Sequence, residues 1–176
     1  IGETLALIGL TDAADRIAPL ADVDACATLA AALEEEGIHL APGVFVQRAR
    51  RDGDDVVATI APRDGSDPYE LRAQTLLLAS GRVPNLEGLN VDELGIETTR
   101  TGIAVDGRLR TSVPGIWAAG DVNAVAQFTP VAQYQARIAV ADMFGDDPPA
   151  ADYSVLPTAI FTDPELGSVG LTEEEA

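Results

Sequence analysis

The strongest constraint on the fold of this chain is a hydrophobic segment that ends in Gly-Asp. Residues 115–119 read Gly-Ile-Trp-Ala-Ala, which predicts a buried strand, and Gly120-Asp121 follows at its carboxyl end. Glycine lets a ligand approach the backbone closely, and a carboxylate at this place can accept hydrogen bonds from hydroxyl groups. Ligands of open α/β sheets bind at this end of the strands. The segment therefore predicts a ligand site, although the same residues also suit an ordinary strand followed by a tight turn.

Two helices are predicted by caps and by glycine stops. Asp22 or Asp24 can cap a helix that runs to about Glu36, directly before a glycine that is a typical C-terminal stop. A second helix is predicted over residues 129–144, with a proline in its first turn and a glycine after its end. Residues 172–175 form a capping-box pattern, which predicts the start of a further helix.

Strands are predicted where apolar residues run together or alternate with polar ones. Asp/Gly turns join three of these strands, at 44–49, 56–61 and 69–73, into a β-meander. Segment 75–79 is continuously apolar, which is typical of a strand buried in a parallel sheet. The other predicted strands cover residues 4–10, 103–105, 115–119, 158–162 and 168–171. Helices mixed with both kinds of strand predict an α/β fold.

Charge and composition exclude several classes of function. The 176 residues include 11 Lys+Arg and 29 Asp+Glu, and the formal net charge of −18 disfavours unaided binding to nucleic acid or to anionic membranes. No apolar run is long enough for a membrane span and no signal peptide is visible, so a cytoplasmic protein is expected. Cys26 and His39, the single cysteine and histidine, are too few for a zinc site, and we expect both to be structural.

Four segments, taken together, carry a resemblance to a known family. Residues 76–85 end in Gly-Arg-Val-Pro-Asn, residues 111–121 end in Ala-Gly-Asp, and residues 127–132 read Gln-Phe-Thr-Pro-Val-Ala. Residues 157–172 contain Phe-Thr-Asp-Pro-Glu and Val-Gly-Leu-Thr. In this order and spacing they resemble the pyridine nucleotide-disulfide oxidoreductases, which include glutathione reductase, dihydrolipoamide dehydrogenase and mercuric reductase. In that family the segments are the crossing from the NAD domain to the FAD domain, the second FAD motif, the helix start beneath the flavin, and the start of the interface domain.

The resemblance implies an α/β architecture made of parts of three domains. Residues 1–80 would be a partial NAD(P)-binding, Rossmann-like domain, and residues 81–150 the C-terminal part of an FAD-binding domain. Residues 151–176 would start an α+β interface (dimerisation) domain. The chain has no G-x-G-x-x-G and no Cys-x4-Cys pair, so we expect it to be a fragment of a larger flavoprotein.

The resemblance also implies contacts with the FAD. Asp121 would bind the ribityl chain through a hydroxyl group, and Gly120 would let the backbone come close to it. Gly81 would lie near the cofactors at the domain crossing, and Arg82 would contact them there or only brace the loop.

The start of the 129–144 helix would face the pyrimidine edge of the flavin. A helix N-terminus stabilises negative charge, and reduced flavin carries negative charge at this edge. Proline has no N–H group, so the amides of Val131 and Ala132 are the expected donors. The flavin-facing residues would be Phe128, Thr129, Pro130, Val131 and Ala132.

Asp12 is a candidate ligand of the nicotinamide cofactor. In this family an acid at the end of the second strand of the NAD(P) domain suits NAD, whereas an Arg suits NADP. The predicted strand ends at residues 8–10 and Asp12 lies slightly beyond, where it also suits a loop residue that caps local backbone. The choice between NAD and NADP stays open at this point.

The implied function is electron transfer from NAD(P)H through FAD to a disulfide-type or metal-ion substrate. The full-length protein would be a homodimeric enzyme, and the fragment alone is expected to be inactive. One alternative is a flavoenzyme without a Cys pair, similar to NADH oxidases or ferredoxin reductases. Another is a non-catalytic acidic interaction domain.

Overall fold

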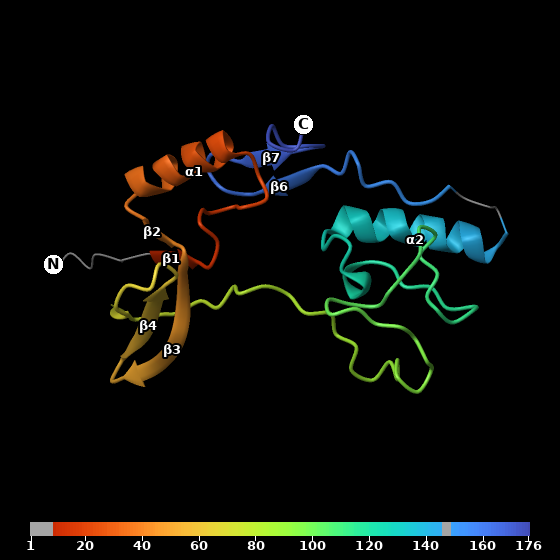
Figure 1. Ribbon diagram of the computed structural model, residues 1–176, viewed down its shortest axis with the longest axis horizontal. Coiled ribbons are helices and arrows are strands. Elements are labelled where there is room, and N and C mark those ends of the chain that lie inside the picture. The colour runs from red at the N-terminus through yellow and green to blue at the C-terminus, as the bar shows by residue number, and fades with distance from the viewer. Residues whose placement is uncertain (1–8, 146–148) are drawn as a thin grey trace. The chain divides into compact units, whose positions relative to one another are not determined.

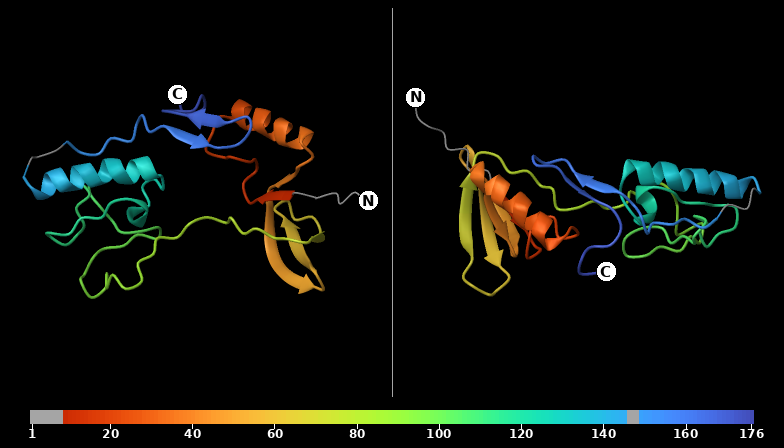
Figure 2. Two further views of the ribbon diagram at one scale, coloured as in Figure 1. Left: turned by 180° about the vertical axis from the view of Figure 1, so that it is seen from behind. Right: turned by 90° about the horizontal axis from the view of Figure 1, so that it is seen from above.

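The computed structural model describes residues 9–145 and 149–176, which form two compact units (Figure 1). The described residues up to 78 and residues 154–176 form the first unit, and residues 79–153 form the second. Figure 2 follows the same elements from behind and from above. Of the strand predicted at 4–10, residues 4–8 lie outside the described part of the chain.

A parallel pair of strands joined by a helix begins the first unit. Strand β1 (Gly9–Asp12) pairs in parallel with β2 (His39–Pro42), and helix α1 (Val23–Glu35) connects them. The predicted first helix is therefore confirmed. Gly37 follows its cap with a φ of +86°, which residues with a Cβ rarely adopt, so the glycine stop has a steric cause.

The apolar face of α1 supplies the core of this unit. Cys26 and Leu29 are buried, and Ala30 and Leu33 pack at the edge of the same cluster, as predicted. The Cys26 sulfur lies within hydrogen-bond distance of the carbonyl oxygen of Ala18, at 3.2 Å, so the thiol is part of the packing. The buried cluster comprises Ile17, Ala21, Cys26, Leu29 and Leu166.

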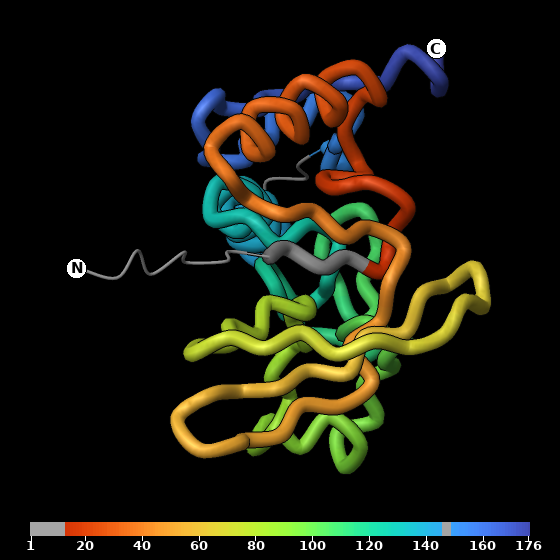
Figure 3. The backbone as a smooth tube through the Cα atoms, turned by 90° about the vertical axis from the view of Figure 1, so that its left-hand side faces the viewer, coloured from red at the N-terminus to blue at the C-terminus, as the bar shows by residue number. Residues whose placement is uncertain are grey.

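Three antiparallel strands confirm the predicted β-meander. Strands β3 (Val44–Asp52), β4 (Asp55–Pro62) and β5 (Tyr69–Ala73) lie side by side in that order, which Figure 3 shows along the sheet. Gly53 has a φ of +64° at the β3–β4 turn, as the Asp/Gly pattern requires. Ile60 on β4 is among the most deeply buried side chains of the sheet.

A short hairpin completes the first unit beside α1 (Figure 1). Strands β6 (Thr158–Ile160) and β7 (Leu166–Ser168) pair in antiparallel register, and residues 161–165 join them. The second strand starts two residues earlier and ends three residues earlier than predicted. Its Leu166 is buried in the α1 cluster, which fixes this register. At 172–175 the described residues form a turn and not the predicted start of a helix. Thr172 donates its amide and its hydroxyl to Glu175 Oε2, each at 2.9 Å, and the Glu175 amide donates to the Thr172 carbonyl oxygen at 3.2 Å.

The second unit is built on one helix and a series of turns. Helix α2 (Thr129–Met143) confirms the second predicted helix, with Pro130 in its first turn. A 3-10 turn, η1 (Asp121–Asn123), follows the Gly-Asp motif. The helix buries Val131, Gln135, Ile138 and Ala139. None of the helices in the described ranges is long and apolar enough to span a membrane.

Three predicted strands, one in the segment that leads into the second unit and two within that unit, do not form. Segment 75–79 is irregular and Leu77 is 85% exposed, while 115–119 and 103–105 are reduced to isolated bridges, Arg110 with Trp117 and Thr98 with Ile103. A strand needs hydrogen-bonded neighbours, and within the described residues these segments pair with none over more than one residue. The apolar pattern predicted burial correctly only for Ile103 and Ala118.

Candidate cofactor site

The Gly120-Asp121 turn packs directly on the first turn of α2. Gly120 has φ +85° and ψ −156°, a conformation that is essentially restricted to glycine. A Cβ placed on Gly120 would lie 3.2 Å from the Cβ of Ala132. The motif therefore needs glycine for two reasons, the backbone conformation and the close approach to the helix.

A buried glutamine holds this turn in place. Gln135 is fully buried, and its Oε1 accepts hydrogen bonds from the Gly120 amide at 2.6 Å and from Asn123 Nδ2 at 2.9 Å. Its Nε2 donates to the Tyr153 hydroxyl at 2.9 Å. Asn123 also donates to the Ala118 carbonyl oxygen at 3.0 Å. The Gln135 side chain thus links the Gly-Asp turn to Tyr153, the last residue of the second unit.

Arg82 and Asp121, predicted from separate motifs, form an ion pair. Arg82 Nη2 lies 2.7 Å from Asp121 Oδ2, and the two side chains are 69% and 39% exposed. Gly81, with a φ of +110°, turns the chain directly before Arg82. The Asp121 carboxylate is therefore oriented by a cation and is accessible to a ligand.

The amides at the start of α2 differ in their availability. The Ala132 amide donates to the Phe128 carbonyl oxygen at 3.1 Å, so it is engaged in the first helical hydrogen bond. Pro130 has no N–H group, and within the described residues we find no acceptor for the Val131 amide. Phe128 and Thr129 are exposed beside it. Of these two amides, only that of Val131 has no acceptor among the described residues, and Val131 is 1% exposed.

A second close contact supports the turn from another side. Gly102 lies so near η1 that a Cβ there would be 2.5 Å from the Val122 carbonyl oxygen. The same oxygen accepts a hydrogen bond from the Ile103 amide at 2.9 Å. The hairpin around Gly102 thus fixes the backbone that carries Asp121.

The far end of α2 is held by a buried carboxylate. The Asp142 side chain is nearly inaccessible, its Oδ2 lies 2.6 Å from Arg110 Nε, and it also accepts a hydrogen bond from Trp117 Nε1 at 2.9 Å. The hydrogen bond from Arg110 holds the pKa of the Asp142 carboxyl below its usual range, against the opposing effect of desolvation. Trp117 is half-buried and packs at the edge of this core.

Sequence reasoning missed three residues that build the site, namely Gln135, Asn123 and Gly102. A signal for Gln135 was present, because it interrupts the apolar stripe of α2 four residues after Val131 and three before Ile138. A polar residue in such a stripe needs buried partners. Its partners are distant in sequence, so the pattern alone could not name them.

Asp12 is the last residue of β1, in the first unit. Its side chain lies outside the described part of the structure. Because β1 runs parallel to β2, Asp12 lies at the carboxyl end of a parallel strand pair. The loop that follows is fixed by Arg63, whose Nη1 lies 3.1 Å from the Ala13 carbonyl oxygen and 2.8 Å from Asp15 Oδ1.

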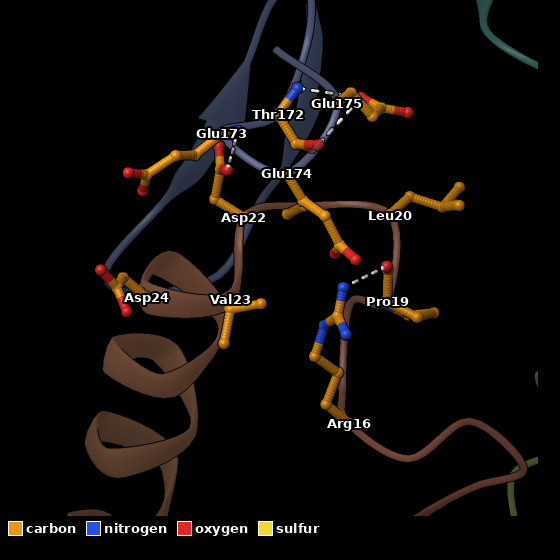
Figure 4. A pocket seen from close by; sticks show the side chains of 11 residues that line it. Arg16, Pro19, Leu20, Asp22, Val23, Asp24, Thr172, Glu173, Glu174 and Glu175 are labelled. Carbon is orange, nitrogen blue, oxygen red and sulfur yellow. Dashed lines mark hydrogen bonds between the residues drawn. The ribbon is translucent and has the colours of Figure 1, made fainter.

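The first unit also has a pocket, which contains none of the predicted site residues (Figure 4). It lies between the start of α1 and the last residues of the chain, and has a volume of about 510 Å³. The Glu173 amide donates to Asp22 Oδ1 at 2.7 Å across it. Five acidic side chains and only Arg16 line it, so its charge opposes an anionic ligand.

The two units define a class of protein. A parallel β1–α1–β2 unit with a meander, and a glycine-dependent Gly-Asp turn on a helix start, form a segment of an FAD/NAD-binding oxidoreductase fold with mixed α/β elements. Residues 6–136 match the family described as "Pyridine nucleotide-disulphide oxidoreductase". The chain belongs to this family, as its motifs predict.

Individual relatives cover most of the chain. It is 35% identical to dihydrolipoyl dehydrogenase 3 of Pseudomonas putida over 92% of its length, and 37% identical to mercuric reductase of Streptomyces lividans over 80%. These matches cover 34% and 30% of the relatives, so the chain spans about a third of the length of the curated relatives it matches.

Two solved structures are similar to this chain in fold. The crystal structure of LpdA from Mycobacterium tuberculosis superposes with a TM-score of 0.86 at 28% identity, over 96% of this chain and 36% of that one. The HOCl-induced flavoprotein disulfide reductase RclA from Escherichia coli gives a TM-score of 0.83 at 29% identity, over 96% of this chain and 38% of that one.

Proposed function

We propose that this chain is part of a flavoenzyme that passes electrons from NAD(P)H through FAD to a disulfide-type or metal-ion substrate. The observation that carries the proposal is the accessible Asp121 carboxylate on a glycine turn packed against the start of α2. These residues fit FAD, because the Asp121 side chain is 39% exposed and its carboxylate can accept a hydrogen bond from a ligand hydroxyl. Bound FAD supplies the redox chemistry, which protein side chains lack.

The residues of the chain then have distinct roles. Asp121 accepts a hydrogen bond from a ribityl hydroxyl, and Arg82 holds the carboxylate in place from 2.7 Å. The first turn of α2, through the Val131 amide, presents a positive partial charge to the pyrimidine edge of the flavin. Gly81 leaves room beside the cofactor at the turn into this unit.

The names of the relatives support the class of acceptor. They include dihydrolipoyl dehydrogenase, mercuric reductase and a flavoprotein disulfide reductase. We propose that the full-length protein is a homodimer in the cytoplasm and that residues 151–176 begin its interface domain. The segment alone would be inactive, since it holds one cysteine and a disulfide pair needs two.

We propose Asp12 as a ribose ligand of the nicotinamide cofactor. Its place at the carboxyl end of a parallel strand supports this, because nucleotides bind there in α/β folds and a carboxylate suits ribose hydroxyls. Asp12→Ala in the full-length protein should raise the KM for NADH with little effect on the flavin content. An unchanged KM would remove Asp12 from the site.

Flavin content tests the central proposal. The full-length protein should purify yellow with bound FAD, and Asp121→Ala should lose most of that flavin on gel filtration. Released flavin is measured by its visible absorbance after denaturation. A colourless full-length protein that does not take up added FAD would overturn the proposal and favour a non-catalytic domain.

A further inference from the structure

We infer that Gln135 is a positioning residue for the flavin site, which fixes the Gly120-Asp121 peptide through the amide of Gly120. The inference rests on the proposed function, because the ligand that the peptide serves there is FAD. Gln135 itself is fully buried and lies behind the turn, so it acts through the backbone.

The hydrogen bonds of Gln135 are directed at the turn. Its Oε1 accepts from two donors, the Gly120 amide at 2.6 Å and Asn123 Nδ2 at 2.9 Å. These donors stand on either side of Asp121 in the chain. Asn123 Oδ1 in turn accepts from the Val125 amide at 3.1 Å. One acceptor atom of α2 therefore sets the path of the backbone on both sides of the Asp121 carboxylate.

An apolar residue would pack as well as Gln135 without these bonds. Its neighbours on the helix face are Val131, Ile138 and Ala139, all buried. A buried amide in an apolar stripe is unfavourable unless all its partners are satisfied. In Gln135 both ends are satisfied, since Nε2 reaches the Tyr153 hydroxyl at 2.9 Å. The role of the amide at this position is therefore to bind the Gly120 amide and Asn123 Nδ2 through its oxygen.

The two ends of the side chain provide a matched pair of variants. Gln135→Met keeps the length of the side chain but removes the acceptor for Gly120 and Asn123. Tyr153→Phe removes a hydrogen bond from the same buried network at the other end, and leaves Oε1 in place. If Gln135 serves only stability, both variants will behave alike apart from the melting temperature.

The experiment measures the Kd for FAD and the melting temperature of the apo form of the full-length protein. We expect Gln135→Met to weaken FAD binding by roughly tenfold or more, because two donors at the turn lose their acceptor. Tyr153→Phe should stay within about threefold of the wild type, since the loss lies away from the turn. Gln135→Glu, which keeps an acceptor oxygen, should recover most of the affinity lost in Gln135→Met.

Two results would overturn the inference. A Gln135→Met protein that binds FAD as tightly as Tyr153→Phe shows that the glutamine does not position the turn. If Gln135→Met does not fold, Gln135→Asn replaces it, because the shorter side chain does not reach Gly120, and the same loss of FAD affinity is expected. Unchanged FAD binding by Gln135→Asn would also overturn the inference. A wild-type protein that binds no FAD refutes the proposed function as well, so the two failures are distinguishable.

Discussion

The glycines of the second unit allow strain and steric contact to be measured separately. Gly120→Ala introduces both, because Gly120 has φ +85° and ψ −156° and its new Cβ would lie 3.2 Å from the Cβ of Ala132. The backbone conformation costs about 1–3 kcal/mol for a residue with a Cβ, and a crowded core contact adds about 1–3 kcal/mol. Gly120→Ala should therefore destabilise the second unit by about 2–6 kcal/mol.

Two other glycines serve as controls for this variant. Gly115 has the same φ of +85°, but a Cβ added there would meet no atom within 4 Å, so Gly115→Ala tests strain alone, about 1–2 kcal/mol. Gly102 has no positive φ but would place a Cβ 2.5 Å from the Val122 carbonyl oxygen, so Gly102→Ala tests the contact alone.

Urea unfolding followed by tryptophan fluorescence measures these three effects. Trp117 is the only tryptophan of the chain and lies in the second unit, so its signal reports on this unit. Gly120→Ala should lower the free energy of unfolding clearly more than Gly115→Ala does. If the two variants are equally stable, the turn does not pack closely on α2 and the account of the Gly-Asp motif is wrong.

Three further predictions concern the core, an ion pair and pH. Leu29→Ala should destabilise the first unit by about 2–5 kcal/mol, because Leu29 is 4% exposed, whereas Leu20→Ala, at a 92% exposed site, should leave the urea midpoint unchanged. Arg82→Gln should weaken FAD retention by less than Asp121→Ala does, since exposed ion pairs contribute only about 0–1 kcal/mol, and an equal loss of flavin would contradict this. The lowered pKa of Asp142 means that its stabilising effect is complete above the ordinary Asp pKa and is lost as the pH falls through the lowered value. Acid unfolding monitored by Trp117 fluorescence should therefore shift to higher pH in Arg110→Gln. An unshifted transition would show that the Arg110–Asp142 ion pair does not contribute to stability at low pH.

Local signals predicted the helices and the meander. The glycines after α1 and α2, and the Asp/Gly turns between β3, β4 and β5, act within a few residues, so the sequence is sufficient to place them. Segment 75–79 shows the opposite case. Its apolar run predicts burial, but a strand forms only if another strand lies beside it, and no property of the segment itself supplies that neighbour.

The candidate site divides in the same way. The motifs placed Asp121, Gly120 and Arg82 at the site, and the structure brings Arg82 and Asp121 to 2.7 Å. Gln135 could not be paired from sequence, because its three partners lie between 12 and 18 residues away and α2 must first dock before they meet. The acidic pocket beside α1 was not predicted, since it depends on how the β6–β7 hairpin packs.

Because the net charge is −18, an anionic cofactor can bind only where local groups offset the overall negative charge. Over the acidic pocket of the first unit, five carboxylates face one Arg16, and an added phosphate would meet repulsion. At the Gly-Asp turn the Asp121 carboxylate is neutralised by Arg82, and the first turn of α2 adds the positive end of a 15-residue helix. Raising the salt concentration screens most strongly the exposed charges that lie farther apart than the Debye length, so it weakens the diffuse negative field of the surface. FAD affinity should therefore rise or stay constant as salt is added. A steep fall in affinity would show that binding depends on positive charges outside the Gly-Asp turn and the start of α2.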